Sequence, residues 1–119
     1  MGLKNLISEL ESEREELRKE LEEIMKRHKW TEKDIAETSA YINRRWVRRG
    51  SYVYFYYYLI VRHRGRVVRN KYLGKTIAPA VKKQVEDLKR AKKLLRRIRA
   101  IERSLKRIEK ELGKVVRNE

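Results

Sequence analysis

The part of the sequence most typical of β-strands is residues 50–75, which read GSYVYFYYYLIVRHRGRVVRNKYLGK. Its β-branched and aromatic residues favour strands, and Gly65 indicates a turn between two of them. We therefore expect a β-hairpin, with one strand over residues 52–62, a turn at Arg64 and Gly65, and a second strand over residues 66–73. The sequence on either side of this hairpin has the periodicity of helices.

Alternation along the first strand divides its side chains between two faces. Val53, Phe55, Tyr57, Leu59 and Val61 point one way, and Tyr52, Tyr54, Tyr56, Tyr58 and Ile60 point the other way. A two-residue loop would place Arg62, Arg69 and Lys71 beside the tyrosines and leave an aliphatic face, with Val68, suited to packing on helices. A three-residue loop with a bulge would instead move Arg69 and Lys71 to the Val53 side.

The segment before the hairpin looks like a short helix. Thr31 is followed by Glu32 and Asp34, which is typical of a helix N-cap with acids in the first turn. Ile35, Ser39, Ile42 and Trp46 then recur at helical spacing, which predicts a helix over residues 32–47 that ends before Gly50. We expect Trp46 in the core and a basic helix end formed by Arg44, Arg45, Arg48 and Arg49.

Two long helices are expected at the ends of the chain. Apolar residues from Leu3 to His28 follow a heptad, interrupted at Arg14 and at His28 itself. A second heptad leads to a helix over residues 80–116, for which Pro79 suits the first turn. The first helix is acidic and the second is basic, which favours pairing them with each other, and a homodimer would cover the surplus heptads of the longer helix.

These expectations define the fold class as α+β and mostly α. Two long helices form an antiparallel coiled coil, and a short helix and a β-hairpin are inserted between them. Within a single domain, residues 1–30 form coiled-coil helix one, residues 31–76 form a basic tyrosine-rich module, and residues 77–119 form coiled-coil helix two.

Charge is concentrated in the middle of the chain. The 119 residues carry 33 Lys and Arg against 17 acids, for a formal net charge of +16. Residues 41–83 hold 12 of these cations, and no carboxylate occurs from Thr38 to Val85. A solvated surface usually mixes the two signs, so a long acid-free basic stretch favours a polyanionic partner, and nucleic acid is the usual one.

The tyrosine strand and its arginines have the chemistry of a nucleic-acid interface. Tyrosine offers a flat ring to sugars and bases and a hydroxyl to phosphate oxygens, while Arg and Lys neutralise phosphates. A two-stranded ribbon also fits the major groove of B-DNA. The candidate nucleic-acid-binding residues are Arg44, Arg45, Arg48, Arg49, Tyr52, Tyr54, Tyr56, Tyr58, Arg62, Arg64, Arg66, Arg69, Lys71 and Lys75. Packing of the tyrosines against helices or against a second copy is the structural alternative.

Several function classes find no support in the sequence. There is no cysteine, His28 and His63 lie far apart, and the acid-free middle lacks the carboxylate cluster of a magnesium-dependent nuclease. We therefore expect no enzymatic activity, no catalytic residues, no metal and no cofactor, although a tyrosine nucleophile stays an alternative. With no signal peptide or membrane anchor in the sequence, we expect a cytoplasmic protein, associated with the nucleoid or the ribosome.

The stretch from Gly50 to Lys75, followed by a basic helix that starts at a proline, resembles small uncharacterised archaeal and bacterial proteins. These combine a tyrosine-rich strand, a glycine turn and a Tyr-Leu-Gly-Lys ending before a charged coiled coil. More distantly, the stretch is similar to the arm-site DNA-binding domains of phage-type integrases, which read DNA with a small sheet. Heavy use of Lys, Arg and Glu also fits a thermophile.

Three functions remain open from the sequence. The first is a non-enzymatic protein, a homodimer through its coiled coil, that binds duplex DNA in an architectural or regulatory role. The second is an RNA-binding or ribosome-associated factor, because tyrosines and arginines also suit RNA. The third is a chaperone-like coiled coil, since the order helix, hairpin, helix resembles a beta-type prefoldin subunit, whose client-binding ends are not basic like this chain.

Overall fold

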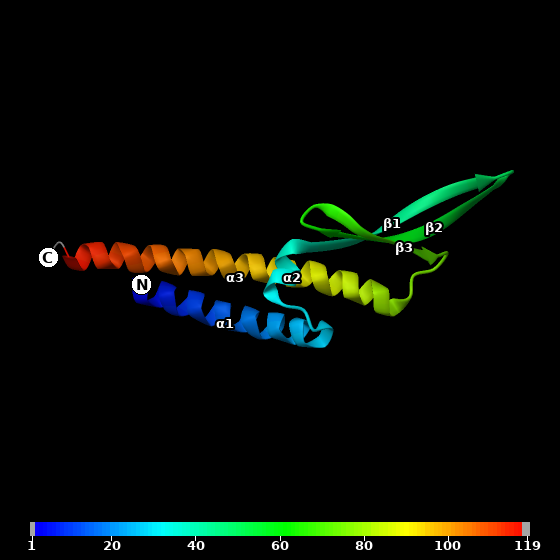
Figure 1. Cartoon of the computed structure of the whole chain (residues 1–119). Coiled ribbons are helices and arrows are strands. Elements are labelled where there is room, and N and C mark those ends of the chain that lie inside the picture. The colour runs from blue at the N-terminus through cyan, green and yellow to red at the C-terminus, as the bar shows by residue number, and fades with distance from the viewer. Residues whose placement is uncertain (1, 118–119) are drawn as a thin grey trace.

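The computed structural model describes residues 2–117, with side chains through Gly113. It is a mixed α+β structure, mostly helical, in which a three-stranded antiparallel sheet lies between two long helices in the sequence (Figure 1). The elements in chain order are α1 (Leu3–His28), α2 (Glu32–Glu37), β1 (Thr38–Arg49), β2 (Tyr52–His63), β3 (Arg66–Gly74) and α3 (Pro79–Arg117).

Helices α1 and α3 lie side by side and run in opposite directions (Figure 1). The core cluster joins Leu21 and Ile24 of α1 to Leu94 and Ile98 of α3, and Ile35 of α2 is fully buried against it. Oppositely charged side chains along the helices reinforce this pairing, because Arg97 and Arg90 of α3 reach glutamates of α1. The expected pairing of the acidic helix with the basic helix is therefore present.

The predicted helix over residues 32–47 is wrong beyond Glu37. Its start is confirmed: the amide of Asp34 donates to the Thr31 hydroxyl at 3.1 Å, and the amide of Thr31 donates to the Asp34 carboxylate at 2.9 Å. From Thr38 onward the chain is strand β1, paired with β2 at all twelve positions. A spacing of four residues is also a multiple of two, so Ile42 and Trp46 share a face in a strand as well as in a helix.

The sheet has the order β1-β2-β3, with the tyrosine-rich strand at its centre. Gly50 and Ser51 connect β1 to β2, and the left-handed φ of 63° at Gly50 suits the first position of a type II′ turn. Arg64 and Gly65 connect β2 to β3 with φ values of 52° and 81°, as a type I′ turn requires. The expected turn at Arg64 and Gly65 is confirmed, and β1 adds a third strand to the expected hairpin.

A bulge in β3 sets the faces of its side chains. Next to the turn, Arg62 faces Val67, but beyond a one-residue shift Val61 faces Arg69 and Leu59 faces Lys71. Arg69 and Lys71 therefore lie on the Leu59 side of the sheet, so their placement beside the tyrosines is wrong. The alternative register expected from the sequence places Arg69 and Lys71 on this side, as the structure does. The extra residue, however, lies within β3, and the loop keeps two residues.

Beyond the end of β3, strands β1 and β2 continue as a two-stranded ribbon that points away from the helices (Figure 1). We call residues 45–56 the ribbon arm. Trp46 is 65% exposed there, so its expected place in the core is wrong. Val53 and Phe55 are also exposed, and of the expected aliphatic face only the part around Leu59 is buried. The arm extends beyond the reach of α3, which leaves both of its faces open to solvent.

Candidate nucleic-acid interface

Five tyrosines form a strip on the face of the sheet that points away from α3, and a sixth, Tyr41 of β1, shares this face opposite Ile60. Tyr52, Tyr54, Tyr56 and Tyr58 alternate along β2, and Tyr72 of β3 joins them directly opposite Tyr58. The Tyr72 ring lies 5.4 Å from that of Tyr58 and 5.9 Å from that of Tyr56, between centroids. Tyr52 and Tyr54 are 6.4 Å apart. The rings thus form an aromatic strip along the sheet in two contacting groups, Tyr52 with Tyr54, and Tyr72 with Tyr56 and Tyr58.

Four basic residues share this surface with the tyrosines. In the β1–β2 register, Arg45 faces Tyr56 and Arg49 faces Tyr52. The Arg45 guanidinium lies 4.4 Å from the centre of the Tyr58 ring, and the Lys75 ammonium lies 5.1 Å from the Tyr54 ring. These cation–π contacts hold the charges over the aromatic strip. We define the tyrosine face as Tyr52, Tyr54, Tyr56, Tyr58, Tyr72, Arg45, Arg49, Arg62 and Lys75.

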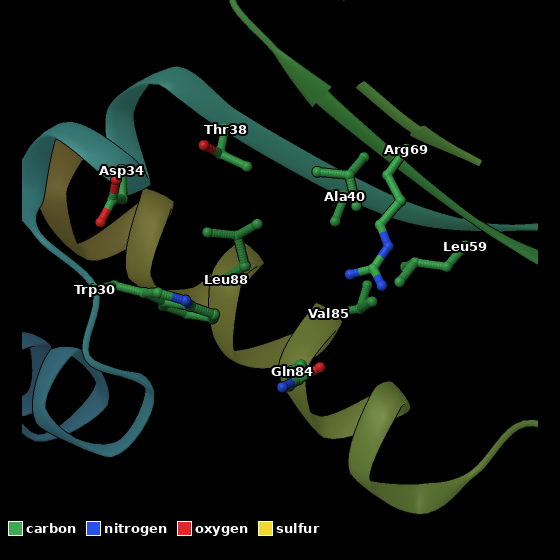
Figure 2. A pocket seen from close by; sticks show the side chains of 10 residues that line it. Trp30, Asp34, Thr38, Ala40, Leu59, Arg69, Gln84, Val85 and Leu88 are labelled. Atoms are coloured by element: carbon green, nitrogen blue, oxygen red, sulfur yellow. The ribbon is translucent and has the colours of Figure 1, made fainter. Parts of the chain in front are cut away.

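The opposite face of the sheet carries a different set of the expected site residues. Arg44 and Arg48 alternate with Trp46 there, and the Arg44 guanidinium lies 4.7 Å from the centre of the Phe55 ring. Toward the helices this face closes over a cavity of about 290 Å³. Arg69 points into this cavity beside Leu59, above α3 (Figure 2). Arg69 is therefore turned away from the tyrosine face.

The arginines of the β2–β3 turn are partly engaged within the protein. Arg64 donates to the Glu37 carboxylate at 3.1 Å through its side chain and to the Glu37 carbonyl at 2.8 Å through its amide. This side-chain hydrogen bond holds the pKa of Glu37 below its usual value and raises the pKa of Arg64. His63 is 3.5 Å from the same carboxylate. Arg66, which pairs with His63 across the two strands, is exposed.

The structure divides the fourteen expected site residues among three places. Eight share the tyrosine face: Arg45, Arg49, Tyr52, Tyr54, Tyr56, Tyr58, Arg62 and Lys75. Arg44, Arg48, Arg69 and Lys71 are on the opposite face, and Arg64 and Arg66 are at the turn. Tyr72 is not among the expected site residues, because a regular hairpin without the bulge places it opposite Tyr57 and not opposite Tyr58.

No carboxylate offsets the charge of the tyrosine face, because the three strands contain no Asp or Glu. The cations there are also free of ion pairs: within residues 2–117, no carboxylate lies within 4.0 Å of Arg45, Arg49, Arg62 or Lys75. This surface therefore combines flat aromatic rings with four uncompensated positive charges.

The described residues offer little for other kinds of site. Among them, no group of three or more His, Asp or Glu side chains is placed to hold a metal ion. None of the helices in this part of the chain combines the length and apolar character needed to cross a membrane. The cavity beside Arg69 is mainly apolar and lies between the sheet and α3 (Figure 2).

Comparisons of the chain with models of known protein families, with curated proteins and with solved structures found no match. Inferences about function therefore depend on the chemistry and geometry of the surfaces described above. Among these surfaces, the tyrosine face combines five aromatic rings with four cations and no carboxylate.

Proposed function

We propose that this protein is a non-enzymatic nucleic-acid-binding protein that holds duplex DNA against its tyrosine face. The observation that carries the proposal is the combination, on one acid-free surface, of five tyrosines with Arg45, Arg49, Arg62 and Lys75. Such a surface repels other cations and attracts a polyanion, and its rings suit a ligand with sugars and bases.

The dimensions of a β-sheet are compatible with this role. The major groove of B-DNA is about 12 Å wide and admits a two-stranded ribbon, whose outward side chains then reach the base edges. Arg45 and Arg49 would contact the phosphates that border the groove, because a guanidinium can donate two hydrogen bonds to one phosphate. Tyrosine hydroxyls and Lys75 would contact phosphate oxygens, which fix the position of the protein on the duplex.

The long helices would serve as the scaffold of this interface. We propose that α1 and α3 form an antiparallel coiled coil and that the protein is a homodimer through it. Helix α3 has 39 residues and α1 has 26, so part of α3 extends beyond its partner. A second copy would cover that part and would present two tyrosine faces to one DNA molecule. The resemblance to arm-site domains of phage-type integrases agrees with the use of a small sheet on DNA.

RNA binding is the second candidate, and the exposed aromatic residues of the ribbon arm favour it. Trp46 and Phe55 face each other across the strands, and both are exposed on the side opposite the tyrosines. Sequence-specific RNA recognition relies on unpaired bases that stack on aromatic side chains or on arginine. An arm with rings and arginines on both faces would suit such a ligand.

A salt series of binding measurements tests the proposal and separates the two candidates. Fluorescence anisotropy would compare a labelled duplex DNA, the same sequence as a single strand, and a structured RNA. If the four cations of the tyrosine face each neutralise one phosphate, they alone contribute about −3.6 to the slope of the logarithm of duplex affinity against the logarithm of salt. Tighter binding of the RNA would favour the second candidate. Absence of binding to all three probes at about 50 mM salt, where such contacts are strongest, would contradict both.

A further inference from the structure

Two groups of arginines on α3 differ in their partners. Arg97 contacts Glu13 of α1 with hydrogen bonds of 2.8 and 3.0 Å, and Arg90 contacts Glu20 at the same distances. These ion pairs hold the pKa of Glu13 and of Glu20 below the usual value, through hydrogen bonds from the two arginines. On this side of α3 the charge is therefore compensated from within the protein.

A second group on α3 has no such compensation. Arg96, Arg99 and Arg103 are exposed, and no carboxylate of residues 2–117 lies within 4.0 Å of their side chains. The three side chains border a hollow of about 260 Å³ beside Ile35 and Ala36 of α2. We call these three residues the arginine groove.

The arginine groove continues toward the C-terminal part of α3. Arg99 and Arg103 also border a second hollow, of about 440 Å³, together with Arg14 of α1 and with Lys106. Glu102 and Glu109 line it too, but Glu102 is already bound by Arg18. Arg14, which interrupts the heptad of α1, therefore adds a further cation to the groove.

Concentrating these charges is unfavourable for the isolated protein. Arg99 and Arg103 are four residues apart on one helix, and like charges at this spacing repel each other. The neighbouring Lys92 has a pKa below its usual value, because it is partly buried and, secondarily, because Arg96 is close. An anion bound in the groove would remove this repulsion.

We propose that the arginine groove is a second phosphate-binding surface for the nucleic acid held by the tyrosine face, and the proposal rests on that proposed function. The first and last of these arginines, Arg96 and Arg103, are seven positions apart on α3, which is about 10.5 Å at 1.5 Å per residue. This length matches about three steps of 3.4 Å along one strand of a duplex, so it suits a chain of phosphates better than a single phosphate ion.

Helix α2 lies between the β2–β3 turn of the sheet and the arginine groove. Its last residue, Glu37, is bound by Arg64 of the β2–β3 turn, and its Ile35 and Ala36 border the arginine groove. Lys92 fixes α2 on α3 by donating hydrogen bonds of 2.8 Å to the carbonyls of Ile35 and Thr38. The short helix α2 thus separates the β2–β3 turn from the arginine groove by a few residues of chain.

Two double variants with the same loss of charge test the groove. Arg99→Gln/Arg103→Gln removes two groove cations, and Arg90→Gln/Arg97→Gln removes two cations that already have glutamate partners. The probe is a labelled duplex of about 24 base pairs, which at 3.4 Å per step covers the 81 Å length of the molecule. All four arginines are exposed, so circular dichroism should show both variants folded.

We expect the groove variant to lower the magnitude of the salt slope by about 1.8, because about 0.9 is lost for each phosphate contact. The control variant should keep the wild-type slope. Equal slopes for the groove variant and the wild type would overturn the second surface while leaving the tyrosine face in place. Equal losses in both variants would also overturn it, since net charge alone would then explain the effect. Absence of duplex binding by the wild type would overturn the proposed function itself.

Discussion

Arg44 and Arg45 are neighbours in the sequence, yet they lie on opposite faces of β1. Arg45 rests on Tyr58 of the tyrosine face, and Arg44 rests on Phe55 of the other face. The same alternation separates Arg49 from Arg48. A basic cluster that the sequence presents as one helix end is therefore divided into two pairs, and only one pair accompanies the tyrosines.

Trp46 gives a spectroscopic probe of the face that does not carry the tyrosines. The chain has two tryptophans, so Trp30→Phe leaves Trp46 as the only one. Trp46 is 65% exposed on the opposite face of the ribbon arm. If duplex DNA lies on the tyrosine face, acrylamide should quench Trp46 emission equally well with and without DNA.

The Trp46→Phe variant is the control for this measurement. It reports only Trp30, which stacks on His28 at a ring distance of 4.1 Å, outside the sheet. Protection of Trp46 from acrylamide on binding, with Trp30 unaffected, would show that the duplex lies on the opposite face and would contradict the proposed orientation.

Asp87 predicts a pH dependence of stability. Burial acts to raise the pKa of its carboxyl, but hydrogen bonds of 2.7 Å with His28 and 2.8 Å from Arg27 outweigh burial and lower the pKa. A carboxyl whose pKa is lower in the folded state stabilises the protein above its unfolded pKa, and this contribution is lost as pH falls through the folded pKa.

We therefore expect Asp87→Asn to lower the free energy of unfolding at pH 7 by about 1 kcal/mol, a modest value because Arg27 is half exposed to solvent. The difference from the wild type should shrink as the pH falls below the usual range of an aspartate. Urea unfolding across a pH series measures it. A difference that stays constant down to the acid limit would show that the carboxylate charge is not responsible.

At the scale of elements, the junction of α2 and β1 depends on a residue far away in the sequence. The Lys92 ammonium donates to the carbonyls of Ile35 and Thr38, at the point where the helix gives way to the strand. Lys92→Met should keep the packing of the side-chain stem and leave these carbonyls without their charged donor. We expect a loss of about 1–3 kcal/mol in the free energy of unfolding.

Lys93→Met is the matched control, because Lys93 is exposed on the same helix. Urea unfolding should show it close to the wild type. If the two variants unfold at the same urea concentration, the contact of Lys92 with the junction contributes nothing to stability.

The sequence predicted some elements well because their signals are local. The heptads marked α1 and most of α3, the Thr31 capping box marked the start of α2, and Gly65 marked the β2–β3 turn. The identity of β1 depended instead on pairing with β2, a non-local effect that overrides helical spacing. The bulge in β3 likewise has no clear signature in the sequence, and it decides the faces of Arg69 and Tyr72.

Across the whole molecule, the positive charge falls into three groups. Glutamates of α1 compensate Arg90 and Arg97 and help to pair the long helices. The cations of the tyrosine face and of the arginine groove have no such partners among the described residues. The protein is elongated, with extents of 81 × 26 × 24 Å, and the two surfaces lie on different elements, the sheet and α3.

A comparison of the two faces of β1 tests whether duplex DNA binds through the tyrosine face. Arg45→Gln/Arg49→Gln and Arg44→Gln/Arg48→Gln remove the same charge from the same strand, but from opposite faces. The measurement is the salt dependence of affinity for duplex DNA. We predict that the first variant lowers the magnitude of the slope by about 1.8 and weakens binding, while the second keeps the wild-type slope. A loss confined to the Arg44/Arg48 variant, or an equal loss in both, would contradict binding through the tyrosine face.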